Sequence, residues 1–200
     1  MFKKLLKIMP WANKDTNEFI TVQLNDKIMP LDRGDFYEEP LNEFLQKYGY
    51  GEVSGGGTMQ SETGEIIFCD IEIMVYKNQS CEQIANGIIP FLEAKGVPKG
   101  SAVTIEESKE IPFGKAEGLA IYLDGINLAD NVYNECDPDY VMQELSMLTG
   151  NSGNIQRYWQ GETETAFYFY GKSYDKMKAA ITEFVSSYPL CKGARVVQIA

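Results

Sequence analysis

The sequence predicts an α+β protein built from two copies of one β-α-β-β-α-β unit. Strand-like and helix-like patterns follow one another in that order twice along the 200 residues. With 44% hydrophobic and 12% aromatic residues, the chain can bury a core and is not expected to be disordered. The last helix and strand of each copy are joined by a shared Lys-Gly-x-x-Val, at Lys99–Val103 and Lys192–Val196. The order is that of a ferredoxin-like unit, an antiparallel sheet with both helices on one face.

The first copy is expected over residues 17–112. Residues 18–24 alternate as a half-buried strand, and a polar loop containing Pro30 and Gly34 follows. The later elements are a helix over 40–48 ended by Gly49, strands over 52–59 and 65–76 joined by a turn at 61–64, a helix over 80–95 capped by Ser80, and a strand over 101–105.

The second copy is expected over residues 113–200. Its elements are a strand over 118–123, a helix opened by Asp137 and Pro138 and ended by Gly150, hairpin strands over 154–160 and 165–170, a helix capped by Ser173, and a strand over 194–199. The link over residues 106–115 shows no periodicity. Two separate sheets and one continuous eight-stranded sheet are both compatible with so short a link.

The charge is strongly acidic. The formal net charge is −11, and residues 1–14 carry four lysines and no acid, so the remainder carries −15. This charge makes nucleic-acid binding improbable and suits a basic protein partner, although solubility alone also explains an acidic surface.

The expected location is the cytoplasm, with no stable membrane insertion. No apolar run approaches the roughly 18 residues that a membrane span needs, and the basic tail over residues 1–16 lacks the features of a signal peptide. That tail is either loosely docked or an amphipathic contact with a membrane surface. The four cysteines are widely spaced and are expected to be reduced, mostly buried thiols.

The chain contains no histidine, which excludes the common histidine-dependent nucleophilic and zinc sites. No cofactor, metal or catalytic residue is predicted. The glycine-rich stretch Gly51–Thr58 precedes a hairpin instead of a helix, so a bulge or close backbone approach is favoured over a phosphate loop.

Two carboxylate pairs are candidate binding residues. Asp70 and Glu72 lie two apart on a strand and therefore point to one face, between Phe68 and Met74. Glu162 and Glu164 lie beside Trp159 in the second hairpin. Such pairs can bind a cation or share acid–base chemistry, although solvated strands and turns also carry them.

Aromatic residues cluster in the second hairpin. Tyr158 and Trp159 lie on one strand, and Phe167 to Tyr170 lie on the next. Because neighbours on a strand face opposite ways, either Phe167 with Phe169 or Tyr168 with Tyr170 must point away from the helices. That face is either packed on another sheet of the chain or open to a ligand or partner. Tyr158, Trp159, Tyr168 and Tyr170 are the predicted binding aromatics.

Three segments, residues 113–125, 158–171 and 188–200, resemble a set of bacterial proteins of similar length, and the resemblance extends to Gly55–Thr58. No established activity is attached to that set, so it implies no catalytic residues. In size and charge the chain is also similar to immunity proteins of bacterial toxin systems.

The resulting hypothesis is a non-catalytic protein-binding function, with the acidic, aromatic sheet face meeting a basic partner. The alternative is a small-molecule sensor or carboxylate-based enzyme with a pocket between the two units. Self-association through a free edge strand is a third possibility.

Overall fold

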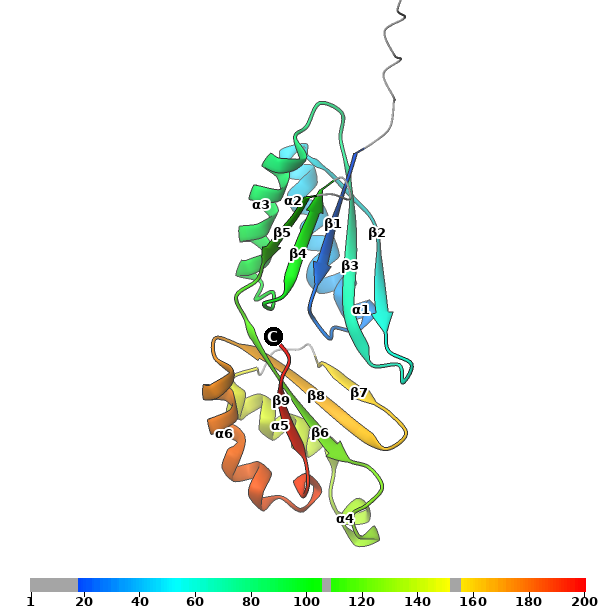
Figure 1. Ribbon diagram of the computed structural model, residues 1–200, viewed down its shortest axis with the longest axis vertical. Helices are drawn as coiled ribbons and strands as arrows, with labels where there is room; N and C mark the ends of the chain where they lie inside the picture. Colours follow the sequence, from blue (N-terminus) through cyan, green and yellow to red (C-terminus); the bar gives the residue numbers. More distant parts are fainter. Residues whose placement is uncertain (1–17, 106–108, 152–155) are drawn as a thin grey trace, which may run out of the picture.

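The computed structural model describes residues 18–105, 109–151 and 156–200. These residues form two antiparallel sheets with helices packed against them, which confirms the α+β class (Figure 1). The predicted N-terminal tail, and the beginning of the strand predicted over 154–160, lie outside the described residues. Within the described part of the chain, no helix is long and apolar enough to cross a membrane.

The first unit is a five-stranded sheet with strand order β2-β3-β1-β4-β5. Its strands are β1 (Glu18–Leu24), β2 (Gly51–Gln60), β3 (Ile66–Val75), β4 (Ser101–Ile105) and β5 (Lys109–Phe113). Helices α2 (Glu39–Tyr48) and α3 (Cys81–Ala94) cover one face, where Ile20, Val22 and Leu24 are fully buried. The alternation of β1 therefore places its apolar residues as the sequence predicts.

Two expectations about the first unit are wrong. The polar loop expected around Pro30 is helical: α1 (Pro30–Arg33) runs through a π-helical turn, η1 (Gly34–Glu38), into α2. Pro40 has no amide hydrogen and would clash with a carbonyl one turn back, and the wider turn before it accommodates the ring. The link expected after residue 105 contains β5, where Pro112 is tolerated because β5 is an edge strand.

The second unit is a four-stranded sheet with strand order β7-β8-β6-β9. Its strands are β6 (Glu117–Asp124), β7 (Tyr158–Gln160), β8 (Glu164–Gly171) and β9 (Arg195–Gln198). Helices α5 (Pro138–Thr149) and α6 (Tyr174–Ser187) pack on one face, and α4 (Asp130–Glu135) and η2 (Pro189–Cys191) are short additions. Asp137 and Ser173 cap α5 and α6 as expected.

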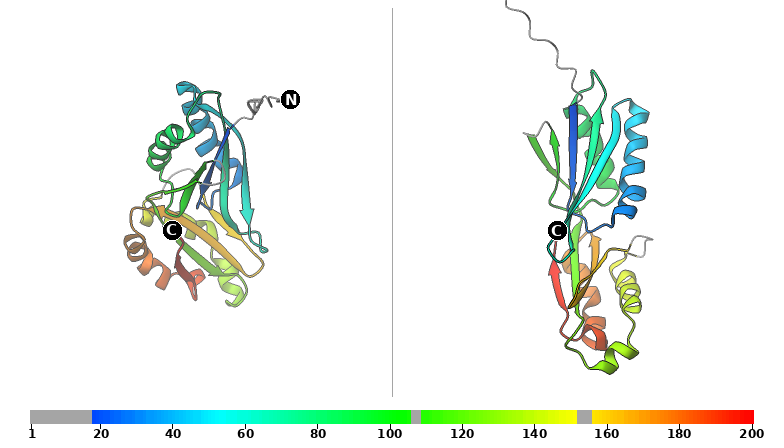
Figure 2. Two further views of the ribbon diagram at one scale, coloured as in Figure 1. Left: turned by 45° about the horizontal axis from the view of Figure 1, so that its top comes forward. Right: turned by 90° about the vertical axis from the view of Figure 1, so that its right-hand side faces the viewer.

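The two sheets are separate, so the single eight-stranded sheet is not formed. The units lie end to end, and the C-terminus lies between them (Figures 1 and 2). The β2–β3 hairpin reaches across to the second sheet, where the Trp159 indole N–H donates to the Thr63 carbonyl at 3.1 Å.

The glycine-rich stretch has the structural role that its position predicts. The β2–β3 register shifts between Val53 and Gly55, as at a bulge. A Cβ atom on Gly56 would lie 2.7 Å from the Asp70 carbonyl oxygen and 2.8 Å from Glu38 Oε1. The glycine therefore lets the Arg33–Glu38 ion pair lie directly on the strand.

Candidate functional site

The first sheet has one face that no helix covers within the described residues (Figure 2). We call this surface the acidic face. Strand register and alternation assign to it Phe19, Thr21, Gln23, Glu52, Met59, Phe68, Asp70, Glu72, Met74, Tyr76, Thr104 and Glu110. It carries four carboxylates and no lysine or arginine among these residues. The predicted pair Asp70 and Glu72 lies at its centre, opposite Gln23 and Thr21 of β1.

The carboxylate of Asp70 is incompletely hydrogen-bonded. Its Oδ1 atom is buried and has no hydrogen-bond partner among the described residues. Burial raises the pKa of the Asp70 carboxyl, and a hydrogen bond from the Gln23 amide and the charge of Arg33 only partly oppose that rise. A buried carboxylate oxygen that lacks a donor lowers native-state stability. A carboxyl group whose pKa is raised in this way is also a candidate functional residue.

We expect Asp70→Asn to raise the free energy of unfolding at pH 7 by about 1 kcal/mol, because the poorly solvated charge is removed. The effect has a defined pH dependence. Since the native pKa lies above the ordinary value of 3.8, ionisation of Asp70 costs nothing well below that value. The cost develops as the pH rises through the native pKa. Urea unfolding should therefore give similar free energies of unfolding for the wild type and Asp70→Asn at pH 3, and a higher value for Asp70→Asn at pH 7.

Glu72→Gln is the matched control, because Glu72 is exposed and its Oε1 already accepts from the Ser54 hydroxyl at 2.8 Å. It should change stability much less than Asp70→Asn. A pH-independent difference between Asp70→Asn and the wild type would contradict this account of Asp70.

The corresponding face of the second sheet is covered by the first unit. Tyr168 is only 3% exposed, and its hydroxyl donates to Glu65 Oε1 at 2.8 Å, as does that of Tyr122. The Tyr170 hydroxyl accepts the Lys27 backbone N–H at 3.0 Å. Of the two possibilities for these aromatics, packing within the chain is the one observed, so Tyr168 and Tyr170 lie in the contact between units.

The other two predicted aromatics, Trp159 and Tyr158, lie on opposite faces of the second sheet. Trp159 packs on the covered face with Ala166 and bonds to Thr63, so it also belongs to the contact between units. Tyr158 pairs with Phe167 on the helix side of edge strand β7 and is 44% exposed. Three of the four predicted binding aromatics, Trp159, Tyr168 and Tyr170, therefore lie together in the contact between units, and Tyr158 lies apart from them.

A buried ion pair joins the units. Asp26 is fully buried and receives the Arg157 guanidinium in a two-point contact, Nε to Oδ1 at 2.6 Å and Nη2 to Oδ2 at 2.9 Å. The Tyr37 hydroxyl donates to Oδ2 at 2.8 Å. Burial lowers the pKa of Arg157, but the charge of Asp26, its hydrogen bonds with the guanidinium and the nearby Tyr37 and Tyr170 together outweigh burial and raise that pKa. The two-point contact fixes the start of β7 against the first unit.

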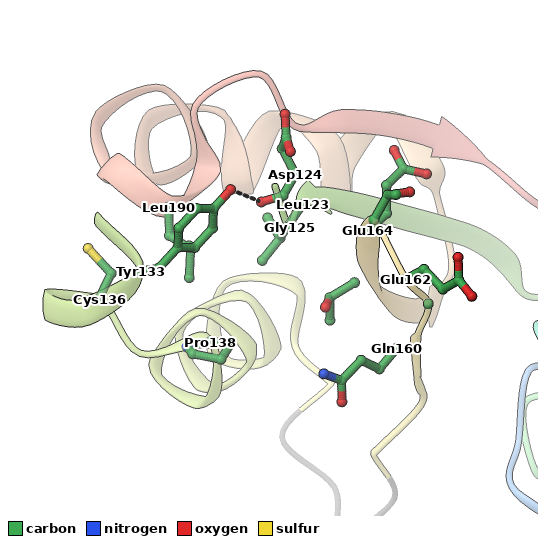
Figure 3. Close-up of a pocket in the computed structure, with 13 residues that line it drawn as sticks. Leu123, Asp124, Gly125, Tyr133, Cys136, Pro138, Gln160, Glu162, Glu164 and Leu190 are labelled. Atoms are coloured by element: carbon green, nitrogen blue, oxygen red, sulfur yellow. Dashed lines mark hydrogen bonds between the residues drawn. The ribbon is translucent and has the colours of Figure 1, made fainter. Parts of the chain in front are cut away.

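The second carboxylate pair borders a pocket of about 270 Å³ in the second unit (Figure 3). Figure 3 shows the carboxylates of Glu162 and Glu164 pointing away from its centre and from each other. Glu164 forms an ion pair with Arg195 at 2.9 Å. Asp124 also lines the pocket, and both of its carboxylate oxygens accept hydrogen bonds from Asn127 in the same loop. Within the described residues no group of acidic and cysteine side chains is placed to hold a metal ion.

The two predicted carboxylate pairs therefore lie on different units and do not meet. Sequence reasoning missed Asp26 and Arg157, which are 131 residues apart. The available signal was weak: Asp26 is a charged residue that directly follows an alternating strand.

No protein-family model matches the sequence, and no curated protein matches it. Among solved structures, the acetolactate synthase small subunit from Thermotoga maritima is 14% identical, with a TM-score of 0.28 over 92% of each chain. A putative monooxygenase from Lactobacillus acidophilus NCFM is 14% identical, with a TM-score of 0.29 over 93% of this chain and 95% of that one. The first two RRM domains of yeast poly(U) binding protein Pub1 are 13% identical, with a TM-score of 0.23 over 90% and 99%. Overlaps this low carry no argument about function.

Proposed function

We propose that this protein is a non-catalytic binding protein that presents its acidic face to a basic surface of another protein. The observation that carries the proposal is Asp70, whose buried Oδ1 has no donor among the described residues and lies at the centre of an uncovered sheet face. The Asp70 side chain as a whole is only partly buried, so a lysine or arginine of a partner would form a charge-assisted pair with its carboxylate.

The composition of the acidic face supports a basic protein as its occupant. Its carboxylates include Asp70, Glu72 and Glu110, with no basic side chain among them. Phe19 and Tyr76 are 43% and 38% exposed and would lose apolar area from water in a complex. A nucleic acid would be repelled by the same charges. A basic toxin domain, neutralised when this surface covers it, is a partner of the required chemistry.

We also assign each unit to the ferredoxin-like arrangement. The orders β2-β3-β1-β4 and β7-β8-β6-β9 both place the first and third strands of the unit at the centre, with β5 as an added edge. A bacterial cytoplasmic location completes the proposal, and the four cysteines, none of which forms a disulfide in the described residues, support a reducing compartment.

The test is the charge reversal Glu72→Lys, which places a cation at the centre of the acidic face. Proteins captured from a bacterial lysate by the wild type should include a basic protein that this variant does not retain. With that protein purified, the Kd for Glu72→Lys should be about 100-fold weaker, because a like charge replaces an attractive pair. Wild-type binding should also weaken as salt is raised.

Glu183→Lys is the matched control, since Glu183 is exposed on α6, away from the acidic face. It should bind as the wild type does, and circular dichroism should show both variants folded. The proposal fails if no captured protein depends on Glu72, or if both charge reversals weaken binding equally.

A further inference from the structure

A second cavity, of about 400 Å³ and open to solvent, is lined by residues of both units. It is bordered by the end of α3, the β5–β6 connection and the turn between β8 and α6, which meet where the units adjoin (Figure 1). The alternative hypothesis from the sequence was a pocket between the units that uses carboxylates. The charged residues that line this cavity are instead mainly cations: Lys95, Lys115, Arg157 and Lys172, with Glu93 as the one acid among the described lining residues.

Two of these cations have carboxylate partners and two do not. Lys115 pairs with Glu93 at 2.5 Å, and Arg157 pairs with Asp26. Lys95 and Lys172 form no ion pair within the described part of the chain. In a chain of net charge −11, two unpaired lysines at one cavity are an uneven distribution.

Aromatic rings contact two of the cations, Lys95, which has no carboxylate partner among the described residues, and Arg157, which also pairs with Asp26. The Lys95 ammonium lies 4.9 Å from the centre of the Phe36 ring and 5.7 Å from that of Phe91. The Arg157 guanidinium lies 5.8 Å from the Phe36 ring and 5.4 Å from the Tyr170 ring. A ring face orients a cation but leaves its N–H donors available to an anion.

Lys95 is also partly desolvated. Burial alone lowers the pKa of its ammonium, with no acidic group opposing the change. A cation in this state gains more from an arriving anion than a fully hydrated surface lysine does.

We propose that this cavity binds a small organic or inorganic anion carrying carboxylate or phosphate groups, with Lys95 and Lys172 as its main charged contacts. The Asn151 side chain lines the cavity and adds polar groups, although its amide oxygen already accepts the Tyr170 backbone N–H at 3.2 Å. A volume of about 400 Å³ suits a ligand of metabolite size. The site is separate from the acidic face, so an anion and a basic protein could bind at once.

The test uses pyrophosphate and citrate as probes, titrated into the full chain by isothermal calorimetry at constant ionic strength. We expect saturable one-site binding of at least one probe, and a matching rise in the melting temperature. The double variant Lys95→Met/Lys172→Met should weaken that binding at least 10-fold.

The matched control is Lys47→Met/Lys178→Met, which removes two exposed helix lysines that also lie over tyrosine rings, outside the cavity. It should bind the probes as the wild type does. The proposal is overturned if neither probe gives saturable binding, or if both double variants weaken it equally, since that would be a general charge effect. Glu72→Lys should leave probe binding unchanged, which distinguishes failure of this site from failure of the acidic face.

Discussion

Asp26→Asn is expected to lower the free energy of unfolding by about 3–5 kcal/mol, the range found when one partner of a buried ion pair is removed. The asparagine fills the same space, so packing is retained. The guanidinium of Arg157, however, stays buried without its counter-charge, and Tyr37 loses an ionised acceptor. Both side chains of this pair are largely shielded from water, and its loss should also loosen β7 from the first unit.

Urea unfolding measures the effect, with far-UV circular dichroism for the whole chain and Trp159 fluorescence for the junction, in a Trp11→Phe background. Asp35→Asn, an exposed carboxylate in η1, should change stability by less than about 0.5 kcal/mol. The double variant Asp26→Asn/Arg157→Met should recover part of the loss, because no unpaired charge remains. A loss below about 1 kcal/mol for Asp26→Asn would show that the pair does not hold the units together.

Gly114→Ala is expected to destabilise the chain by at least about 3 kcal/mol, from backbone strain and overpacking together. Gly114 has φ +98°, a conformation that residues with a side chain rarely adopt. A Cβ atom there would lie only 2.0 Å from the Pro98 carbonyl oxygen. Around that contact the connection between the units is fixed by backbone bonds, with the Lys99 N–H donating to Ala116 and the Lys115 N–H to Val97.

Gly193→Ala separates the two causes. Gly193 has φ +77° and open space around the Cβ position, so alanine there meets only the conformational cost, about 1 kcal/mol. Chemical denaturation of both variants should place Gly114→Ala at least 2 kcal/mol below Gly193→Ala. Equal losses would mean that the close approach to Pro98 relaxes without cost.

Local patterns predicted much of this fold because local chemistry determines it. Ser80, Asp137 and Ser173 cap helices since their side-chain oxygens reach amides within the first turn. The alternation of β3 places Asp70 and Glu72 opposite the buried Ile71 and Ile73. Each of these outcomes depends on residues a few positions apart.

Features that depend on distant residues were not predictable. Pro30 and Gly34 are typical loop residues, yet α1 begins at Pro30 and a π-helical turn that starts at Gly34 leads into α2. The partner of Asp26 lies 131 residues away, and nothing around either residue identifies the other. Which aromatic pair of β8 faces away from the helices, and what covers it, depends on where the other unit lies.

During synthesis, the β2–β3 hairpin is made before the face of the second sheet that it covers. Residues 18–113 complete the first sheet, so the hairpin that carries Thr63 and Glu65 can form before Tyr168 and Trp159 leave the ribosome. The face of the second sheet that carries Tyr168 and Trp159 can then pack against the β2–β3 hairpin while the second unit folds. The apolar surface of that face is therefore shielded from other nascent chains. The reverse order of units would leave that face exposed until synthesis ended. We therefore expect the second unit, expressed without the first, to aggregate.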